Sequence, residues 1–307
     1  MKFPVLSTEK LIQRLKPPRR KIRVIMDTDT FNEIDDQFAV AYALKSSERI
    51  DMQAFFAAPF FNERSIGPKD GMEKSYNELN KILSLMGNKI PVFKGSDMFM
   101  PDSETPVGSD ASSYLAKLAM ESSEEDPLYV VSIGAITNVA SAILTNPDII
   151  QKIVVVWLGG HALHWKDTRE FNLYQDVHAA RIILDSGVPL VLIPCMGVAS
   201  HLVTTLSEVR DYIKDQGEIG KYLYEIFFNV TNGEFARSRV IWDISTIAFL
   251  NNDTWTPSVL VHSPIISNEG FWSVDMTRHF IRYVQYIKRD EVFCDFFMKL
   301  KHDTCVH

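Results

Sequence analysis

The sequence is poor in cysteine and has no long apolar run. Its three cysteines, Cys195, Cys294 and Cys305, are odd in number, widely spaced and outside any CxxC pair. A disulfide framework is therefore not expected, and a reducing compartment fits better. No stretch reaches the roughly 18 apolar residues of a membrane-spanning helix, and the N-terminus lacks the apolar centre and cleavage site of a signal peptide. These absences predict a cytoplasmic protein without a membrane partner.

Positive charge is also in short supply. The 307 residues include 32 Lys and Arg against 39 Asp and Glu, which gives a net charge of −7 at pH 7. Apart from residues 16–23 there is no long basic run, so nucleic acid is not an expected partner. Apolar residues make up 46% of the chain, which is ample for a sizeable core.

Apolar, strand-like runs alternate with helical patterns along most of the chain. The predicted strands are 22–26, 52–57, 91–93, 128–132, 153–158 and 189–193. The predicted helices between them begin near 35 and cover about 65–86, 137–144 and 177–185. The strands are rich in Val and Ile throughout, as strands buried on both faces are. This order predicts an α/β fold with a mostly parallel central sheet flanked by helices.

The two ends of the chain follow other patterns. Residues 6–16 predict a short helix ended by Pro17 and Pro18, so residues 1–20 form an N-terminal preamble. Residues 205–250 are predicted to be mostly helical, 258–286 to form strands, and 291–300 a last helix. No repeat or linker interrupts the chain, so we predict one domain over residues 1–307.

The densest cluster of charge follows the first strand, in the stretch RVIMDTDTFNEIDDQFAVAYAL at 23–44. Within ten residues it contains Glu33 and the four aspartates Asp27, Asp29, Asp35 and Asp36. If this loop packs against the domain, its carboxylates need a cation or raised pKa values, and a hard divalent ion is the simplest solution. The alternative is an acidic surface loop that caps the next helix.

In open parallel sheets, ligands bind outside the carboxyl ends of the strands. The residues that follow the predicted strands here are Asp27 and Asp29, Asn62, Ile133 and Gly134, and Gly159 and Gly160. The predicted topology would bring these strand ends, and the side chains that follow them, to one edge of the sheet.

Together these motifs resemble the inosine-uridine preferring nucleoside hydrolase family, whose opening pattern is an apolar strand followed by DxDPGxDD. The matching segments are Asp27 to Asp29 with Asp35 and Asp36, Asn62, IGAITNVASA at 133–142, LGG at 158–160, EFN at 170–172 with Asp176, and Trp242 with Asp243. The resemblance covers about residues 21–260. It implies a Rossmann-like fold, hydrolysis of N-ribosides, a nucleoside as the small-molecule partner, and a homodimer or homotetramer.

The resemblance also implies a Ca²⁺ ion and a role for each acidic residue. The implied ligands are Asp29, Asp36, Asp243 and the main-chain carbonyl of Ile133. Asp29 would also deprotonate the attacking water, Asp35 would bind a ribose hydroxyl, and Asp27 would support the ligands from behind. Ca²⁺ suits such a set because it takes six to eight oxygen ligands.

The sequence departs from the family pattern inside the acidic loop. Between Asp29 and Asp35 it has five residues, two more than the family, and the Pro-Gly turn is absent. A gapless match would keep the spacing but put Phe31 where the base must be. We prefer a two-residue insertion, because a longer loop costs little whereas losing the carboxylate would abolish the chemistry. Asn32 and Glu33 are then free to reach the pocket.

The sugar and base contacts follow from the same resemblance. Glu170, Asn172 and Asn62 would bind the sugar hydroxyls, and His164 replaces a family asparagine near the 5′-hydroxyl. The alternative for each is a polar residue on a solvated loop.

Trp242 stands where many family members have a histidine that protonates the leaving base. The purine-preferring branch has tryptophan there, and an aromatic face contributes about 1–3 kcal/mol per stacked base. We therefore expect purine ribosides to be favoured. A core tryptophan is the alternative, and His161 and His164 are further candidates for leaving-group contacts.

Two other functions remain open from the sequence. VIMDTDT matches the DxDxT motif of haloacid dehalogenase-like Mg²⁺ phosphatases, with Ser132 as a second motif, although later strands end in WLGGH and IPCMG without the required acidic pair. The other alternative is a nucleoside- or ribose-binding protein on the hydrolase scaffold, suggested by the altered acidic loop.

Overall fold

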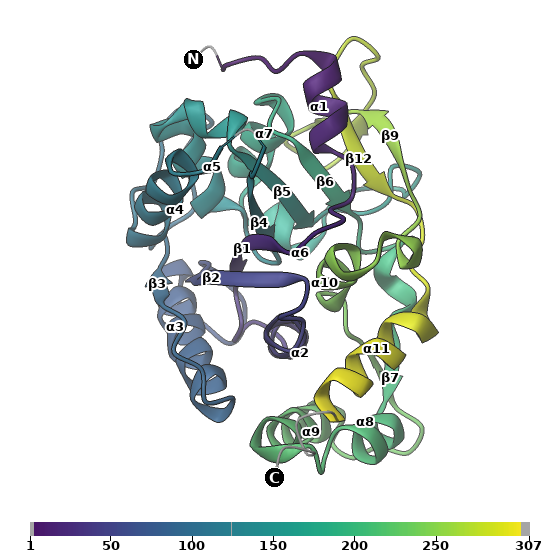
Figure 1. The fold of residues 1–307 in the computed structure, drawn as a ribbon. Coiled ribbons are helices and arrows are strands. Elements are labelled where there is room, and N and C mark those ends of the chain that lie inside the picture. Colours follow the sequence, from purple (N-terminus) through teal and green to yellow (C-terminus); the bar gives the residue numbers. More distant parts are fainter. Residues whose placement is uncertain (1–2, 124, 302–307) are drawn as a thin grey trace.

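The computed structural model describes residues 3–123 and 125–301 and is built around an eight-stranded sheet (Figure 1). The strand order is β3-β2-β1-β4-β5-β6-β12-β9. Their bounds are β1 Ile22–Thr28, β2 Ile50–Ala57, β3 Val92–Lys94, β4 Leu128–Ser132, β5 Ile153–Leu158, β6 Leu190–Ile193, β9 Ser258–His262 and β12 Phe280–Val284. All neighbours pair in parallel except β12 and β9, which are antiparallel. The predicted mostly parallel sheet is confirmed.

Side chains of the central strands are buried on both faces of the sheet. In β4, for example, Val130 packs into the apolar cluster on one face and Val131 into the cluster on the other. Successive residues of a strand point to opposite faces, so a strand covered on both sides must be apolar at every position. This explains why β4 and β5 appear in the sequence as continuous Val- and Ile-rich runs.

Two groups of helices cover the two faces, on opposite sides of the sheet in Figure 1. The helices of one face are α2 Asp35–Leu44, α3 Pro68–Leu85, α8 Leu206–Tyr212, α9 Gly217–Thr231, α10 Ile244–Asn251 and α11 Arg289–Lys301. Those of the other face are α4 Asp110–Met120, α5 Thr137–Thr145 and α7 Val177–Asp185. Among the described residues, no helix is both long and apolar enough to cross a membrane.

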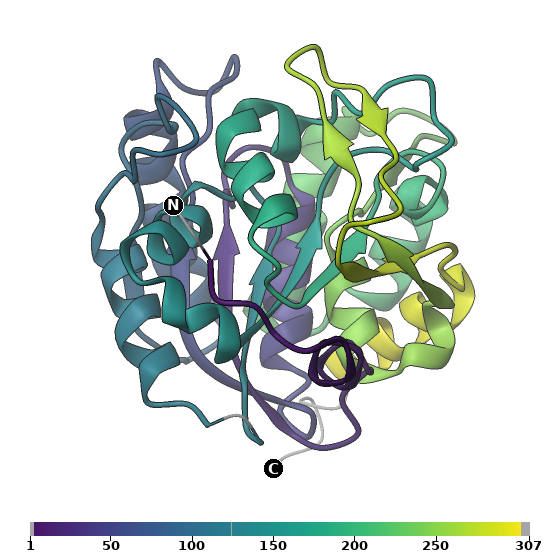
Figure 2. The ribbon, with the colours of Figure 1, turned by 90° about the horizontal axis from the view of Figure 1, so that it is seen from above.

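Several short elements complete the fold. They are α1 Thr8–Arg14, α6 Phe171–Gln175, the 3-10 turns Pro147–Gln151, Ala199–His201 and Asp253–Trp255, the antiparallel pair β7 Val203–Thr205 and β8 Ser238–Val240, and the hairpin β10 Ile265–Ile266 and β11 Trp272–Ser273. Figure 2 shows the hairpin at one end of the molecule. Two elements were not predicted from the sequence: α4, although Ser109 caps it with a capping box, and β8, which lies inside the region predicted to be mostly helical.

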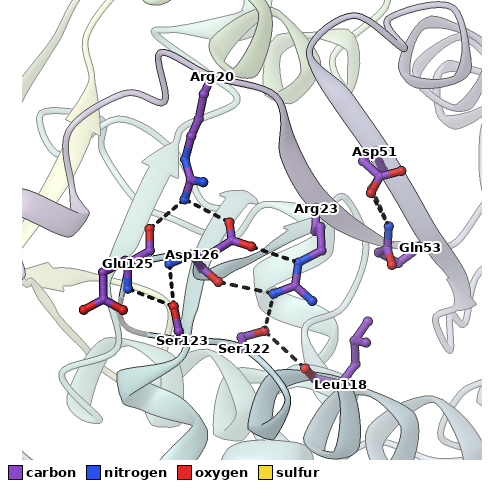
Figure 3. Close-up of polar contacts among 9 residues, drawn as sticks. All are labelled: Arg20, Arg23, Asp51, Gln53, Leu118, Ser122, Ser123, Glu125 and Asp126. Carbon is purple, nitrogen blue, oxygen red and sulfur yellow. Dashed lines mark hydrogen bonds and ion pairs between the residues drawn. The ribbon is translucent and has the colours of Figure 1, made fainter.

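The N-terminal segment packs against the domain, as the close-up in Figure 3 shows for its arginines. Arg20 donates to the Glu125 carbonyl at 2.6 Å and to Asp126 at 2.9 Å. Arg23, in β1, donates to Ser122 and to the carbonyl of Asp126. These bonds join the start of β1 to the loop before β4, at the opposite end of the strands from their carboxyl ends. That residues 1–307 form one domain stays a prediction.

The cysteines are not paired with one another among the described residues. Cys195 is a buried free thiol and Cys294 an exposed one. Cys305 lies outside the described residues.

Candidate active site

A cavity of about 260 Å³ lies at the carboxyl ends of the central strands. It is bounded by the residues that follow β1, β4, β5 and β6, by the start of α2 and by the residues just before α10. Its lining residues include Asp29, Asn32, Glu33, Asp35, Asp36, Ile133, His161, Arg169, Glu170, Asn172, Cys195, Met196, Trp242 and Asp243. The fold therefore gathers most of the sequence-predicted site residues in one place.

The floor of this cavity is a cluster of buried carboxylates. Asp35 and Asp36 open α2, and Asp243 immediately precedes α10, more than 200 residues later. One carboxylate oxygen from each of these three side chains lies within 4.8 Å of the others. Asp29, which follows β1, lines the same cavity and is 1% exposed.

Burial and mutual repulsion raise the pKa values of these groups. The pKa of Asp29 is raised well above its usual value by burial, and further by the charges of Asp36 and Asp35. The pKa of Asp243 is raised in the same way. Burial raises the pKa of Asp36 to about 7, although a hydrogen bond from Thr28 opposes the shift. Four carboxylates in so little water repel one another unless protons or a cation neutralise them.

The donor set fits a divalent cation. Among the described residues, neither carboxylate oxygen of Asp29 has a hydrogen-bond partner, although both are buried. A buried polar atom without a partner is rare and calls for an explanation. Carboxylate oxygens are the ligands that hard divalent ions prefer, and one bound ion would satisfy this group.

Hydrogen bonds hold the other carboxylates in position. Thr28 donates to Asp36 at 2.5 Å, and the Trp242 backbone N–H donates to Asp35 at 3.2 Å. Asp36 is thus held by a residue of β1, and Asp35 by the residue that precedes Asp243. Such contacts orient ligands before an ion arrives.

Asp27 lies behind the cavity and does not line it. Its side chain is 0% exposed and accepts a hydrogen bond from Asn138 at 2.8 Å, while burial raises its pKa to about 7. The Asp27 carbonyl accepts from the Ile133 N–H at 2.9 Å. A side chain on the next residue, Gly134, would come within about 3.1 Å of Asp29, so glycine lets the end of β4 approach that carboxylate closely.

Glu170 and Asn172 form one wall of the cavity. Glu170 caps α6 and accepts backbone hydrogen bonds from Gly160, Asn172 and Leu173 at 2.8 to 3.0 Å. Asn172 donates its amide to the carbonyl of Leu158 at 3.1 Å. The end of β5 therefore fixes both side chains, and their oxygens can still accept hydrogen bonds from a molecule in the cavity.

Two predicted substrate residues, Asn62 and His164, do not line the cavity. Asn62 donates instead to the side chain of Asn32 at 2.6 Å, and Asn32 does line it. His164 is exposed and packs beside Gly197. A neighbouring histidine, His161, takes the position on the wall.

The acidic loop places its two extra residues at the cavity. Asn32 and Glu33 line it, whereas Phe31 is 36% exposed and does not. The Asn32 N–H donates to the Asp29 carbonyl at 2.7 Å, which keeps the loop compact. Glu33 forms an ion pair with Arg239 of β8 at 2.6 Å, so the loop is joined to a distant strand.

Sequence reasoning did not single out Cys195, Met196 and Arg169 as lining residues. Cys195 and Met196 follow β6, so the rule that ligands bind at strand ends was the available signal. Arg169 directly precedes the predicted site residue Glu170, but whether its side chain reaches the cavity depends on how the loop after β5 folds.

Comparison with known proteins places these features in a family. The model of the family described as inosine-uridine preferring nucleoside hydrolase matches residues 24–282. The pyrimidine-specific ribonucleoside hydrolase RihA of Citrobacter koseri is 29% identical over 195 residues, which are 55% of this chain and 58% of that protein. The match thus spans little more than half the length of this curated relative.

Solved structures share the fold. A plant nucleoside hydrolase, PpNRh1, superposes with a TM-score of 0.71 at 19% identity, covering 91% of this chain and 99% of that one. The purine-preferring ribonucleoside hydrolase from Gardnerella vaginalis gives a TM-score of 0.70 at 20% identity, covering 91% and 98%.

Proposed function

The chain belongs to the inosine-uridine preferring nucleoside hydrolase family, and on this premise we propose that it hydrolyses the N-glycosidic bond of ribonucleosides to a free base and ribose. The observation that carries the proposal is the convergence of Asp29, Asp36 and Asp243 on one buried cavity. Burying several carboxylates together costs free energy of folding, and such clusters with raised pKa values are typical of functional sites.

We propose that Asp29, Asp36, Asp243 and the carbonyl of Ile133 hold Ca²⁺. When bound, the ion would neutralise the carboxylates and lower the pKa of a ligated water. The unpartnered oxygens of Asp29 support this assignment.

The aspartates of the chain have separate roles in the proposed reaction. Asp29 accepts the proton of the attacking water, which its lone pairs permit because no protein donor occupies them among the described residues. Asp35, fixed by the Trp242 N–H, binds a ribose hydroxyl. Asp27 supports the ligands from behind through Asn138 and the end of β4.

The wall formed by Glu170 and Asn172 binds the sugar, with both side chains fixed by the end of β5. Asn62 acts through its hydrogen bond to Asn32, which lines the cavity. We assign no substrate contact to His164, because its side chain is exposed and lies outside the cavity lining.

Trp242 is half-buried and lines the cavity beside the carboxylates. We propose that its ring stacks on the base and favours purines, which offer the larger face. The names of the similar proteins divide on this point, since one is pyrimidine-specific and another purine-preferring.

The phosphatase alternative is poorly supported. Its nucleophile would be Asp27, which is fully buried behind the cavity and bonded to Asn138. A homodimer or homotetramer and a cytoplasmic location stay predictions.

The test measures release of reducing sugar from inosine and uridine, with Ca²⁺ present or removed by a chelator. Ribose release that depends on Ca²⁺ is expected. Thermal unfolding with Ca²⁺ and each riboside runs in parallel, because stabilisation without ribose release would support the binding protein instead.

A further inference from the structure

His161 is held rigidly on the wall of the cavity. Its backbone N–H donates to the Thr168 hydroxyl at 2.9 Å, and its carbonyl accepts from the Trp272 indole at 2.9 Å. Trp272 belongs to the β10–β11 hairpin, which thereby braces the loop after β5. Because its backbone N–H and its carbonyl are both hydrogen-bonded, the backbone of His161 is fixed, and this limits the directions that its side chain can take.

The ring of His161 is oriented by a further hydrogen bond. The Met196 backbone N–H donates to Nδ1 at 3.3 Å. Because a backbone N–H can only donate, Nδ1 carries no hydrogen, and the neutral ring has its hydrogen on Nε2. Burial lowers the pKa of His161, which favours the same neutral form. Within the described part of the chain, Nε2 has no hydrogen-bond partner, so this wall offers one free donor.

The shape of ribose indicates which substrate atom would reach that donor. In a β-riboside the 2′- and 3′-hydroxyls lie on one face of the ring. The base and the 5′-carbon leave the other face from the two carbons that flank the ring oxygen. If the hydroxyls face the carboxylate floor and the base lies against Trp242, the 5′-carbon is directed to the wall across from Trp242.

His161 lines the cavity with Trp242, and its hydrogen bond from Trp272 leads to the other face of the sheet. Trp242 packs with the apolar cluster on one face of the sheet, whereas Leu173 and Trp272 pack with the cluster on the other face. Leu173 and Gly160 donate to Glu170, and Trp272 donates to His161. One hydrogen bond of each wall residue thus leads to the side away from Trp242, while Ala162, which follows His161, packs with the cluster that Trp242 contacts.

We propose that His161, through its Nε2–H, donates a hydrogen bond to the 5′-oxygen of the riboside and makes the protein selective for substrates that carry this oxygen. The proposal rests on the proposed function, because it uses the sugar orientation given there. It assigns the 5′ contact to His161 and not to His164, which is exposed and outside the cavity lining.

A double-mutant cycle between enzyme and substrate tests this assignment. Inosine and 5′-deoxyinosine are compared as substrates for the parent, His161→Ala and His161→Phe, with His164→Ala as the matched control. Loss of one neutral hydrogen bond is worth about tenfold. We therefore expect removal of the 5′-oxygen to lower kcat/KM of the parent and of His164→Ala about tenfold. Both His161 variants should lose about tenfold on inosine and nothing more on 5′-deoxyinosine. The Phe variant preserves the ring's packing if the Ala variant folds poorly.

A third substrate separates this role from protonation of the base. The leaving group of p-nitrophenyl riboside departs without a proton, yet its sugar keeps the 5′-hydroxyl. The His161 variants should therefore lose about tenfold on it as well. Full activity on p-nitrophenyl riboside with a loss on inosine would overturn the proposal, as would an unchanged 5′-deoxy penalty in the variants.

The same cycle is run on dissociation constants for the two nucleosides in the presence of Ca²⁺. If the parent binds both nucleosides but hydrolyses neither, the proposed function fails while the 5′ coupling is still measured. If neither nucleoside binds, both proposals are wrong.

Discussion

Replacing Asp29 by asparagine should move stability and activity in opposite directions. Asp29 is 1% exposed, neither of its carboxylate oxygens has a partner among the described residues, and Asp36 and Asp35 add repulsion. An unsatisfied buried group costs about 1–3 kcal/mol, and more when it is charged. An asparagine at this position would be neutral and could donate its amide to the neighbouring carboxylates. The metal-free variant should therefore be more stable than the parent by at least about 1–3 kcal/mol at pH 8.

The gain should depend on pH in a defined direction. Because the folded-state pKa of Asp29 is raised, the folded parent binds its proton more tightly than the unfolded chain does. The parent therefore loses stability as pH rises, and the advantage of Asp29→Asn should shrink toward zero below the unfolded pKa of 3.8. Denaturant unfolding with a chelator at pH 4.5 and pH 8 measures this difference.

Activity should fall by about 10²–10⁴-fold in the same variant, because an amide cannot take the proton of the attacking water. Inosine hydrolysis at saturating Ca²⁺ measures the loss. A variant that is less stable than the parent at pH 8, or that keeps near-parental turnover, would refute the reasoning. Retained turnover would instead favour the gapless alignment or Glu33 as the base.

The remaining predictions concern the ion, pH and the base. Asp36→Ala and Asp243→Ala should each abolish the rise in melting temperature caused by Ca²⁺, whereas the exposed control Asp51→Ala should keep it; calcium affinity like the parent's in both variants would contradict the site. In metal-free protein, Asp27 and Asp36 have folded pKa values near 7 against a usual 3.8, so their contribution to stability is complete below about pH 4 and lost as pH rises through about 7. The melting temperature measured with a chelator should fall as pH rises through about 7, and Ca²⁺ should restore it. A melting temperature that does not change with pH would contradict this prediction. Trp242→Ala should reduce inosine turnover more than uridine turnover at matched folded fractions, and a parallel fall in both rates, or a parent that prefers uridine, would count against stacking.

Much of the fold could be predicted because the central strands are buried on both faces. Burial on both sides demands an apolar residue at every position, and 128–132 and 153–158 have that pattern, so β4 and β5 were predicted with their observed bounds. The short strand β8 could not be found in this way. It pairs with β7 at the surface, and its three residues are half-buried or exposed, so no periodic pattern marks it.

Parts of the candidate site were also contained in the sequence. Aspartates that follow a buried strand indicated where the acidic cavity would lie, because parallel strands bring their carboxyl ends to one edge. The position of Asp243 beside Asp35 and Asp36 required the resemblance to a family, since more than 200 residues separate them.

Tertiary structure alone decided which histidine reaches the cavity. His161 and His164 are three residues apart on one loop, and no local pattern distinguishes them. The difference arises from contacts with distant segments: Trp272 holds the backbone of His161 and Met196 orients its ring. His164 remains exposed. The sequence determines which side chains can be buried and which can bind a metal ion, whereas the packing of loops against one another determines which of these side chains meet.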